Sequence, residues 1–116
     1  MTRIAGLDLS STALQEIAGI LQQQFPKVEF LKLVMNLSDE SQVEAAFKKV
    51  VEKFGRIDYA VNNAAVGSPL LPTTELSSAT FDKIISVNLK GTWLCERAAL
   101  RQMIIQTPLQ KEPGSP

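Results

Sequence analysis

Three short apolar runs along the chain have the length and composition of β-strands. They span residues 4–9, 28–34 and 57–61, and the second is rich in β-branched and aromatic side chains. The third run ends at Asn62 and Asn63, two residues that tolerate turn and left-handed backbone. The pattern therefore predicts three strands, with a sharp reversal of the chain after the third.

Between and after these runs, apolar residues recur at helical spacing. The hydroxyls of residues 10–12 can cap a first helix, which should end before Pro26. Residues 40–54 carry a narrow apolar stripe, typical of a helix that lies on a sheet. A further helix, capped by Ser77, is predicted to reach about Gln106. Because it is long and apolar on more than one side, we expect it to pack against both the sheet and a partner chain.

This alternation of strands and helices predicts an α/β fold with a parallel, doubly wound sheet of three strands and three helices. With 116 residues the chain should form one domain, which we place at residues 1–107. Residues 108–116 include Pro108, Pro113 and a terminal Gly-Ser-Pro. This composition predicts a disordered tail.

Composition narrows the possible classes of function. The formal net charge is zero and the sequence pI is near 6.2, so nothing favours nucleic acid or an anionic membrane as a partner. A single Cys95 and the absence of His leave neither a disulfide framework nor a Cys/His metal site, and no metal is expected. Residues 1–20 lack the pattern of a signal peptide, and no apolar run reaches 18 residues. A cytoplasmic location is the expectation.

Two motifs in the middle of the chain resemble those of a known enzyme family. They read Gly55-x-Ile57-Asp58-x-x-Val61-Asn62-Asn63-Ala64-Ala65 and, after a loop and half a helix, Val87-Asn88-Leu89-x-Gly91. Their order and content resemble the short-chain dehydrogenases/reductases (SDR family), whose fourth strand ends in Asn-Asn-Ala-Gly. Ala65 departs from that pattern, and its methyl group is tolerable only if the backbone there avoids positive φ. The resemblance implies a partial Rossmann-like fold and an NAD(P)-dependent oxidoreductase acting on the alcohol or carbonyl group of a small molecule.

The resemblance also implies roles for single residues. Asp8 matches an acid that hydrogen-bonds the adenosine ribose and repels the phosphate of NADP, which favours NAD over NADP. The alternative is a solvated carboxylate near a helix N-terminus. Asn36 matches an Asp that binds the adenine amino group, with Leu37 against the ring, and an amide oxygen can accept the same bond. The alternative for Asn36 is a simple turn residue.

Three further positions follow from the same motifs. Asn63 and Ala64 match the turn that lines the cofactor ribose, although the turn alone would explain them. Asn88 matches a helix asparagine that holds a water in the catalytic proton relay, and it is the one catalytic candidate. Asn has low helix propensity and needs a partner if it is buried. The alternative is that Asn88 faces solvent.

The resemblance covers about residues 3–107, which match only the middle of a family domain. Nothing upstream of Ile4 matches the Gly-rich turn that holds the cofactor pyrophosphate. The catalytic Tyr-x-x-x-Lys pair is also absent, because the only tyrosine is Tyr59 and no Lys lies four residues after it. We therefore expect no catalysis and weak or no NAD binding by this chain alone.

Two hypotheses remain open. The chain is either a fragment or truncated form of such an oxidoreductase, or a non-catalytic short protein that docks to a full-length relative through its long helix. In both cases self-association or pairing with a relative through residues 77–106 is expected, because a small sheet cannot cover so apolar a helix.

The family's strand order, 3-2-1-4, carries a structural consequence. The absent first strand would lie between the strands predicted at residues 4–9 and 57–61. Unpaired buried backbone groups cost about 1–3 kcal/mol each. We therefore expect these two strands to close up and pair directly.

Overall fold

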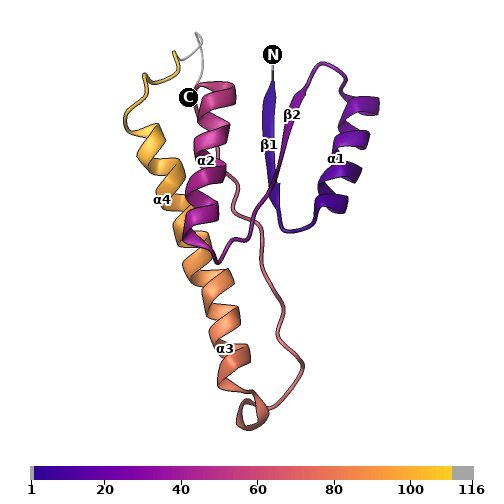
Figure 1. Cartoon of the computed structure of the whole chain (residues 1–116), viewed down its shortest axis with the longest axis vertical. Coiled ribbons are helices and arrows are strands. Elements are labelled where there is room, and N and C mark those ends of the chain that lie inside the picture. Colours follow the sequence, from indigo (N-terminus) through magenta and orange to yellow (C-terminus); the bar gives the residue numbers. More distant parts are fainter. Residues whose placement is uncertain (1, 111–116) are drawn as a thin grey trace.

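The computed structural model describes residues 2–110 and has α/β architecture (Figure 1). In chain order its elements are β1 (Arg3–Asp8), α1 (Ser11–Gln24), β2 (Glu29–Val34), α2 (Glu40–Phe54), the 3₁₀ turn η1 (Thr73–Glu75), α3 (Ser78–Ile84), the π-helical segment η2 (Ile85–Gly91) and α4 (Thr92–Met103). The fold class is confirmed, because strands and helices alternate and the two strands run parallel.

The β1–α1–β2 unit forms around a close approach between strand and helix. β1 and β2 pair from Arg3 opposite Glu29 to Asp8 opposite Val34. A methyl group on Gly6 would lie 2.6 Å from Phe30 Cζ and 3.1 Å from Leu14 Cδ2. Phe30 and α1 therefore leave room only for glycine at position 6.

α2 begins and ends at residues whose chemistry defines a helix boundary. Asp39 is the N-cap, and its Oδ1 accepts a hydrogen bond from the Gln42 backbone N at 3.2 Å. Hydrogen bonds from the Ser41 hydroxyl and the Gln42 backbone lower the pKa of the Asp39 carboxyl. Gly55, at φ +82°, ends the helix in the left-handed conformation that glycine adopts most readily.

The main hydrophobic core lies where α2 packs on α4 and on the sheet. The stripe predicted for residues 40–54 is confirmed, since Val43, Ala46, Val50 and Phe54 are buried there. The buried cluster consists of Leu33, Met35, Val43, Ala46, Val50, Phe54, Ile57, Leu94, Cys95 and Ala98. Burial raises the pKa of the Cys95 thiol, which suits an inert packing residue better than a reactive one.

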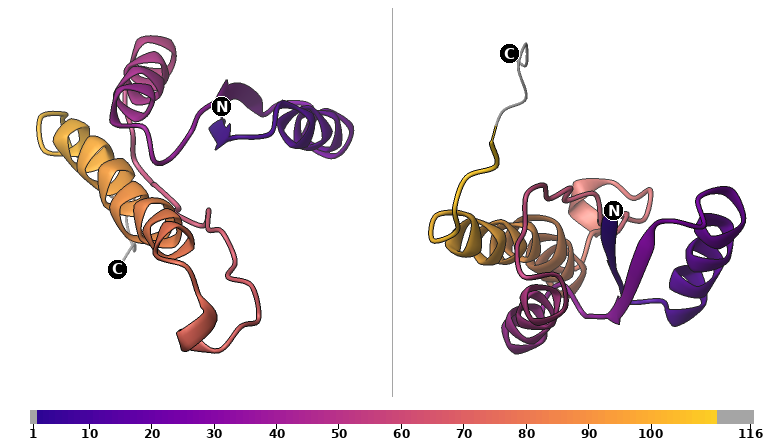
Figure 2. Two further views of the ribbon diagram at one scale, coloured as in Figure 1. Left: turned by 60° about the horizontal axis from the view of Figure 1, so that its bottom comes forward. Right: turned by 90° about the horizontal axis from the view of Figure 1, so that it is seen from above.

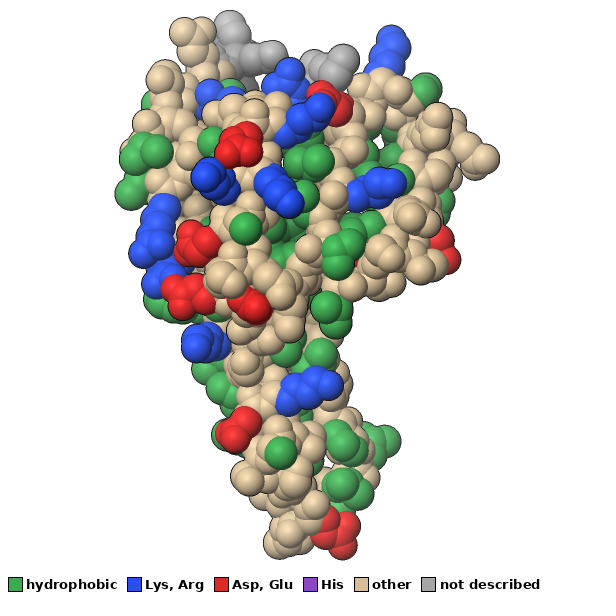
Figure 3. Space-filling view, viewed as in Figure 1, with side chains coloured by type: hydrophobic (Ala, Val, Ile, Leu, Met, Phe, Trp, Pro, Cys, Tyr) green, Lys and Arg blue, Asp and Glu red, His purple; other side chains and the backbone are tan. Residues whose placement is uncertain are grey.

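Ion pairs reinforce the outer side of the contact between α2 and α4. Arg97 Nη2 lies 2.7 Å from Glu40 Oε1, and Arg101 Nη1 lies 3.5 Å from Glu44 Oε1. The surface over these helices carries both signs of charge in alternation (Figure 3). Such a mixed surface gives no electrostatic attraction for a polyanion.

The long C-terminal helix is confirmed, and it contains a π-helical segment that the sequence pattern does not show. α3, η2 and α4 follow one another as a single rod (Figure 2). Ser77 is the predicted N-cap, and its hydroxyl accepts a hydrogen bond from the Thr80 backbone N at 3.1 Å. The rod ends at Met103, three residues before Gln106. Its middle, Ile85–Gly91, is π-helical, a geometry that often marks a functional site.

The prediction of a third strand is wrong. The sheet within residues 2–110 has two strands, and residues 57–61 are extended but unpaired, with Tyr59 86% and Val61 88% exposed. The expected direct pairing of this segment with the first strand is therefore wrong as well.

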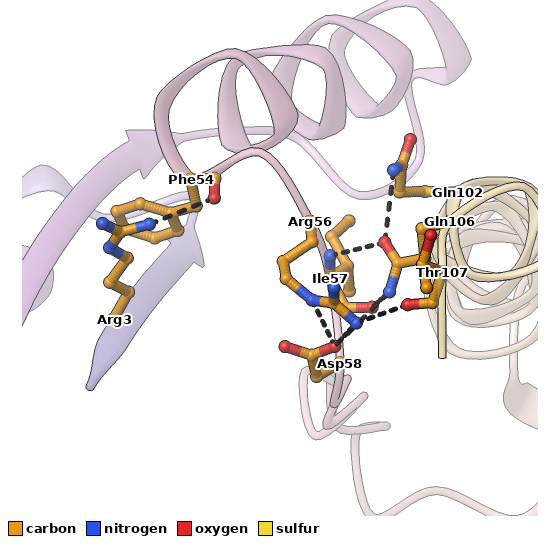
Figure 4. A network of polar contacts seen from close by, with 8 residues as sticks. All are labelled: Arg3, Phe54, Arg56, Ile57, Asp58, Gln102, Gln106 and Thr107. Atoms are coloured by element: carbon orange, nitrogen blue, oxygen red, sulfur yellow. Dashed lines mark hydrogen bonds and ion pairs between the residues drawn. The ribbon is translucent and has the colours of Figure 1, made fainter. Parts of the chain in front are cut away.

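Side-chain hydrogen bonds fix the chain on both sides of this segment, at its first residue, Ile57, and at Val66, five residues after its end. Gln106 bonds both the N–H and the C=O of Ile57 (Figure 4), and Asn88 holds Val66 in the same way. These contacts hold the segment away from β1.

The end of the described chain shows no regular structure. Residues 108–110 carry neither helix nor strand. Residues 111–116, the rest of the predicted tail, lie outside the described residues. Within residues 2–110, no helix has the length and apolar character needed to cross a membrane.

Candidate cofactor-binding site

The carboxyl ends of β1 and β2 meet at one edge of the sheet and carry three of the candidate residues. Asp8 is the last residue of β1, and Asn36 and Leu37 lie two and three residues beyond the end of β2. Ligands of parallel α/β sheets bind at this edge. The topology therefore places both predicted adenosine contacts on the side where a nucleotide would lie.

Asp8 is exposed and only partly engaged. Its Oδ1 accepts a hydrogen bond from the Ser10 backbone N at 2.8 Å, beside the first turn of α1, whose N-cap is Ser10. Its Oδ2 accepts no hydrogen bond within residues 2–110. The carboxylate thus supports the helix terminus, as one interpretation expected, and its second oxygen stays free of hydrogen bonds within residues 2–110.

Asn36 is occupied by its own turn. Its Oδ1 accepts hydrogen bonds from the Ser38 backbone N at 3.0 Å and from the Ser38 hydroxyl at 2.7 Å. Its backbone N donates to Gln42 Oε1 at 2.8 Å. Because a carbonyl oxygen has two lone pairs, this oxygen has no capacity left for an adenine amino group. The adenine role stays a prediction, and it requires Asn36 to release Ser38.

Leu37 packs against the π-helical segment. A methyl group on Gly91 would lie 2.6 Å from Leu37 Cγ and 2.9 Å from its carbonyl oxygen. The turn after β2 can therefore approach η2 this closely only because residue 91 is glycine. Leu37 is half-buried, and its contact with an adenine ring stays a prediction.

Asn88 joins the same segment to the loop that carries Asn63 and Ala64. Its Oδ1 accepts a hydrogen bond from the Val66 backbone N at 2.8 Å, and its Nδ2 donates one to the Val66 backbone O at 2.9 Å. The expectation that a buried Asn88 needs a partner is met by this pair of bonds, and Asn88 is partly buried. Its role in a proton relay stays a prediction.

The structure brings some of the candidates together and leaves others apart. Leu37 contacts Gly91 in η2, the segment that also carries Asn88. Asn63 and Ala64 are exposed, and the Asn63 side chain makes no hydrogen bond within residues 2–110. No non-glycine residue within residues 2–110 has positive φ, so the methyl group of Ala65 is tolerated where the resembled motif has glycine. The sequence did not predict that Val66 would bond Asn88, that Gln106 would bond Ile57, or that Gly91 would lie against Leu37. For Gly91, the spacing Asn88-x-x-Gly91 was an available signal.

Replacing Asn88 with Ala should release the loop after Asn63. The change removes both side-chain hydrogen bonds to Val66 and leaves the Val66 N–H and C=O unpaired. Each of these groups that stays buried lowers the free energy of unfolding by about 1–3 kcal/mol. Hydrogen exchange should show the Val66 amide losing its protection. Asn62→Ala is the matched control, because Asn62 is exposed. Unchanged exchange at Val66 in the Asn88 variant would contradict this account of the loop.

Comparisons with known proteins agree with this geometry. A family model described as short chain dehydrogenase matches residues 2–115. Levodione reductase from Leifsonia aquatica is 37% identical over 101 residues, which are 87% of this chain and 38% of that protein. A crystal structure of levodione reductase superposes with a TM-score of 0.85, over 87% of this chain and 39% of that one.

Two cofactor complexes are also similar. NAD+-bound xylitol dehydrogenase has a TM-score of 0.83 and 30% identity, over 89% of this chain and 39% of that one. The alcohol dehydrogenase of the archaeon Thermococcus sibiricus, complexed with 5-hydroxy-NADP, has a TM-score of 0.79 and 35% identity, over 85% of this chain and 41% of that one. The chain thus spans about two fifths of the length of these relatives. With a family model matched over nearly its whole length and the Rossmann-like edge in place, the chain belongs to the short-chain dehydrogenase/reductase family.

Proposed function

We propose that this chain supplies the adenosine-binding edge of an NAD-dependent oxidoreductase that acts on an alcohol or carbonyl group. The observation that carries the proposal is the Asp8 carboxylate, exposed at the carboxyl end of β1 with one oxygen free of hydrogen bonds within residues 2–110. A carboxylate there accepts bonds from ribose hydroxyls and repels an additional phosphate. This charge favours NAD over NADP.

The other candidate residues fit the adenosine end of the cofactor in part. Leu37 offers an apolar surface, and Asn63 and Ala64 lie exposed on the loop that Asn88 fastens at Val66. Asn36 must first give up its bonds to Ser38. The bound dinucleotide would supply the hydride chemistry, and these residues would hold and orient it.

These 116 residues alone are proposed to bind the cofactor weakly. They contain no Gly-rich turn for the pyrophosphate, so only part of the binding free energy is available. A cytoplasmic location stays a prediction.

The test compares NAD with NADP on the isotope-labelled chain by nuclear magnetic resonance. We expect shifts at Asp8 and Ser10, with NAD preferred by on the order of tenfold, which corresponds to about 1.4 kcal/mol of repulsion. Asp8→Ala should abolish the preference, and Asp82→Ala, which changes an exposed acid on α3, should retain it. If the Asp8 variant prefers NAD over NADP as strongly as the parent chain does, the proposed role of Asp8 is refuted.

A second candidate function, docking to a full-length relative, is supported by the outer face of α4. Trp93, Leu100 and Ile104 recur at i, i+7 and i+11, so they share one face, and they are 49%, 49% and 79% exposed. The buried residues of α4 lie on the opposite face. This apolar stripe has the character of an interface.

The stripe should make the chain self-associate. Ile104→Asp places a charge in it and should shift sedimentation toward the monomer, since a charge buried in an apolar contact is costly. Ile20→Asp on α1, at a site 47% exposed, is the control and should leave association unchanged. A monodisperse monomer at high concentration would count against this function.

A further inference from the structure

The turn between β2 and α2 touches the long helical rod at two points. At the first, Leu37 packs so closely on Gly91 of η2 that a methyl group on Gly91 would lie 2.6 Å from Leu37 Cγ. At the second, Glu40, the first residue of α2, pairs with Arg97 of α4, and 2.7 Å separates Arg97 Nη2 from Glu40 Oε1. α2 and α4 lie side by side (Figure 1). The turn that carries Asn36 is therefore held on both sides of its centre.

The guanidinium of Arg97 is placed by groups from both helices. Its Cζ lies 4.4 Å from the ring centroid of Trp93, one turn earlier on α4, which is the geometry of a cation–π contact. Its Nη2 also lies 3.7 Å from Glu44 Oε1, and the side chain is 24% exposed. Its Nε is buried and has no hydrogen-bond partner within residues 2–110. The Trp93 ring and two carboxylates of α2 therefore hold the group, and Glu40 is the closer carboxylate.

Arg101 makes a weaker contact that does not reach the turn. It lies one helical turn after Arg97, its side chain is 59% exposed, and its Nη1 lies 3.5 Å from Glu44 Oε1. Glu44 stands one turn inside α2, away from the first residue of the helix. Exposed ion pairs of this kind contribute little to stability. The two arginines of α4 therefore form a matched pair, of which only Arg97 contacts the start of α2.

Hydrogen bonds join the start of α2 to the turn before it. The Asp39 carboxylate accepts a bond from the Gln42 backbone N at 3.2 Å, and Gln42 Oε1 accepts one from the Asn36 backbone N at 2.8 Å. The Asp39 backbone N donates to the Asn36 carbonyl oxygen at 3.1 Å. A shift of the first turn of α2 therefore displaces Asn36 and its neighbour Leu37.

We infer that Arg97 is a positioning residue for the adenosine-binding edge. It holds the first turn of α2, and through it holds Asn36 and Leu37 in place beside η2. This role rests on the proposed function, in which those two residues contact the adenine. The Asp8 carboxylate bonds Ser10 and no side chain of this turn. Arg97 therefore sets the affinity for adenine, which NAD and NADP share, and leaves the preference between them to Asp8.

The first measurement is hydrogen exchange on the isotope-labelled chain without cofactor. Arg97→Met keeps an apolar side chain beside Trp93 but removes the charge. It should speed exchange at Ser38 and Asp39, whose amides bond Asn36, by about threefold, as expected for the loss of a partly exposed ion pair. Arg101→Met, the same change one turn along, should leave both amides unchanged. Arg97→Lys keeps the charge and should restore most of the protection.

A double-mutant cycle tests whether the pair with Glu40 is the cause. Glu40→Gln should loosen the same two amides, and adding it to Arg97→Met should have little further effect, because the pair is already lost. Additive effects would mean that the two residues act separately, and would refute the pair as the positioning contact. The Glu40 side chain is 58% exposed, so this variant tests the pair even if Arg97→Met does not fold.

The second measurement adds millimolar NAD or NADP to the same variants. Arg97→Met should weaken both cofactors by the same factor, about threefold, and keep the preference for NAD. Unchanged exchange at Ser38 and Asp39, or an equal change in the Arg101 variant, would overturn the inference. A loosened turn with unaltered NAD affinity would overturn it as well, because Arg97 would then support the fold and not the site. If the parent chain binds neither cofactor, the proposed function fails, and exchange without cofactor still decides whether Arg97 holds the turn.

Discussion

Purified alone, these 116 residues should transfer no hydride from NADH or NADPH to a carbonyl substrate above the uncatalysed rate. General acid catalysis by a positioned side chain contributes about 10²–10⁴-fold. The only tyrosine, Tyr59, has no lysine four residues after it, and it lies 86% exposed in an unpaired segment. Asn88, the remaining catalytic candidate, is bonded to Val66 and has no acid to serve.

The measurement is NADH and NADPH oxidation with a panel of aldehydes and ketones, beside a full-length member of the family as the positive control. Trace contamination is the main risk, and Asn88→Ala addresses it, because turnover that is unaffected by this change does not use the predicted relay. Turnover above background that copurifies with the chain and falls in the Asn88 variant would contradict the prediction.

Leu94→Ala should be the most damaging single change to stability. Leu94 is 1% exposed and lies in the core where α4 meets α2. Truncating a buried leucine removes its transfer free energy and leaves a cavity, which together cost about 2–5 kcal/mol. Because small domains are stable by only about 5–15 kcal/mol, the variant should lose much or all of its folded population.

Leu100→Ala is the matched control, with the same chemical change on the same helix. Leu100 is 49% exposed, so the free energy of unfolding should fall by less than about 1 kcal/mol. Urea unfolding followed by circular dichroism measures both variants. If Leu100→Ala weakens self-association while leaving unfolding unchanged, the two faces of α4 have separate roles. Equal urea midpoints for the two variants would mean that the core around Leu94 does not determine the stability of the fold.

Local signals determined most of the secondary structure from the sequence alone. The apolar stripe of residues 40–54 defines α2 without reference to any other element. Ser77 does the same for the long helix. Helices are built from bonds and side-chain contacts within a few residues, so their signals survive in a linear pattern.

The sequence also carried the family and the edge of the candidate site. Residues 62–65 and the spacing from Asn88 to Gly91 identified the family, which the family model over residues 2–115 confirms. Asp8 lies at the end of one predicted strand and Asn36 follows the next, and parallel strands end at one edge, so their shared position could be expected.

Tertiary structure alone decided whether the third apolar run becomes a strand. Residues 57–61 have the composition of one, but a strand exists only when a neighbour pairs with it, and that neighbour is distant in the sequence. The bonds from Gln106 and Asn88 hold the run away from β1. Long-range contacts also set part of the state of the site, because Leu37 packs against Gly91 and the Asn88 side chain is hydrogen-bonded to the Val66 backbone. Hydrophobic periodicity records which face of an element is buried, but it does not record which backbone group or side chain that face will meet.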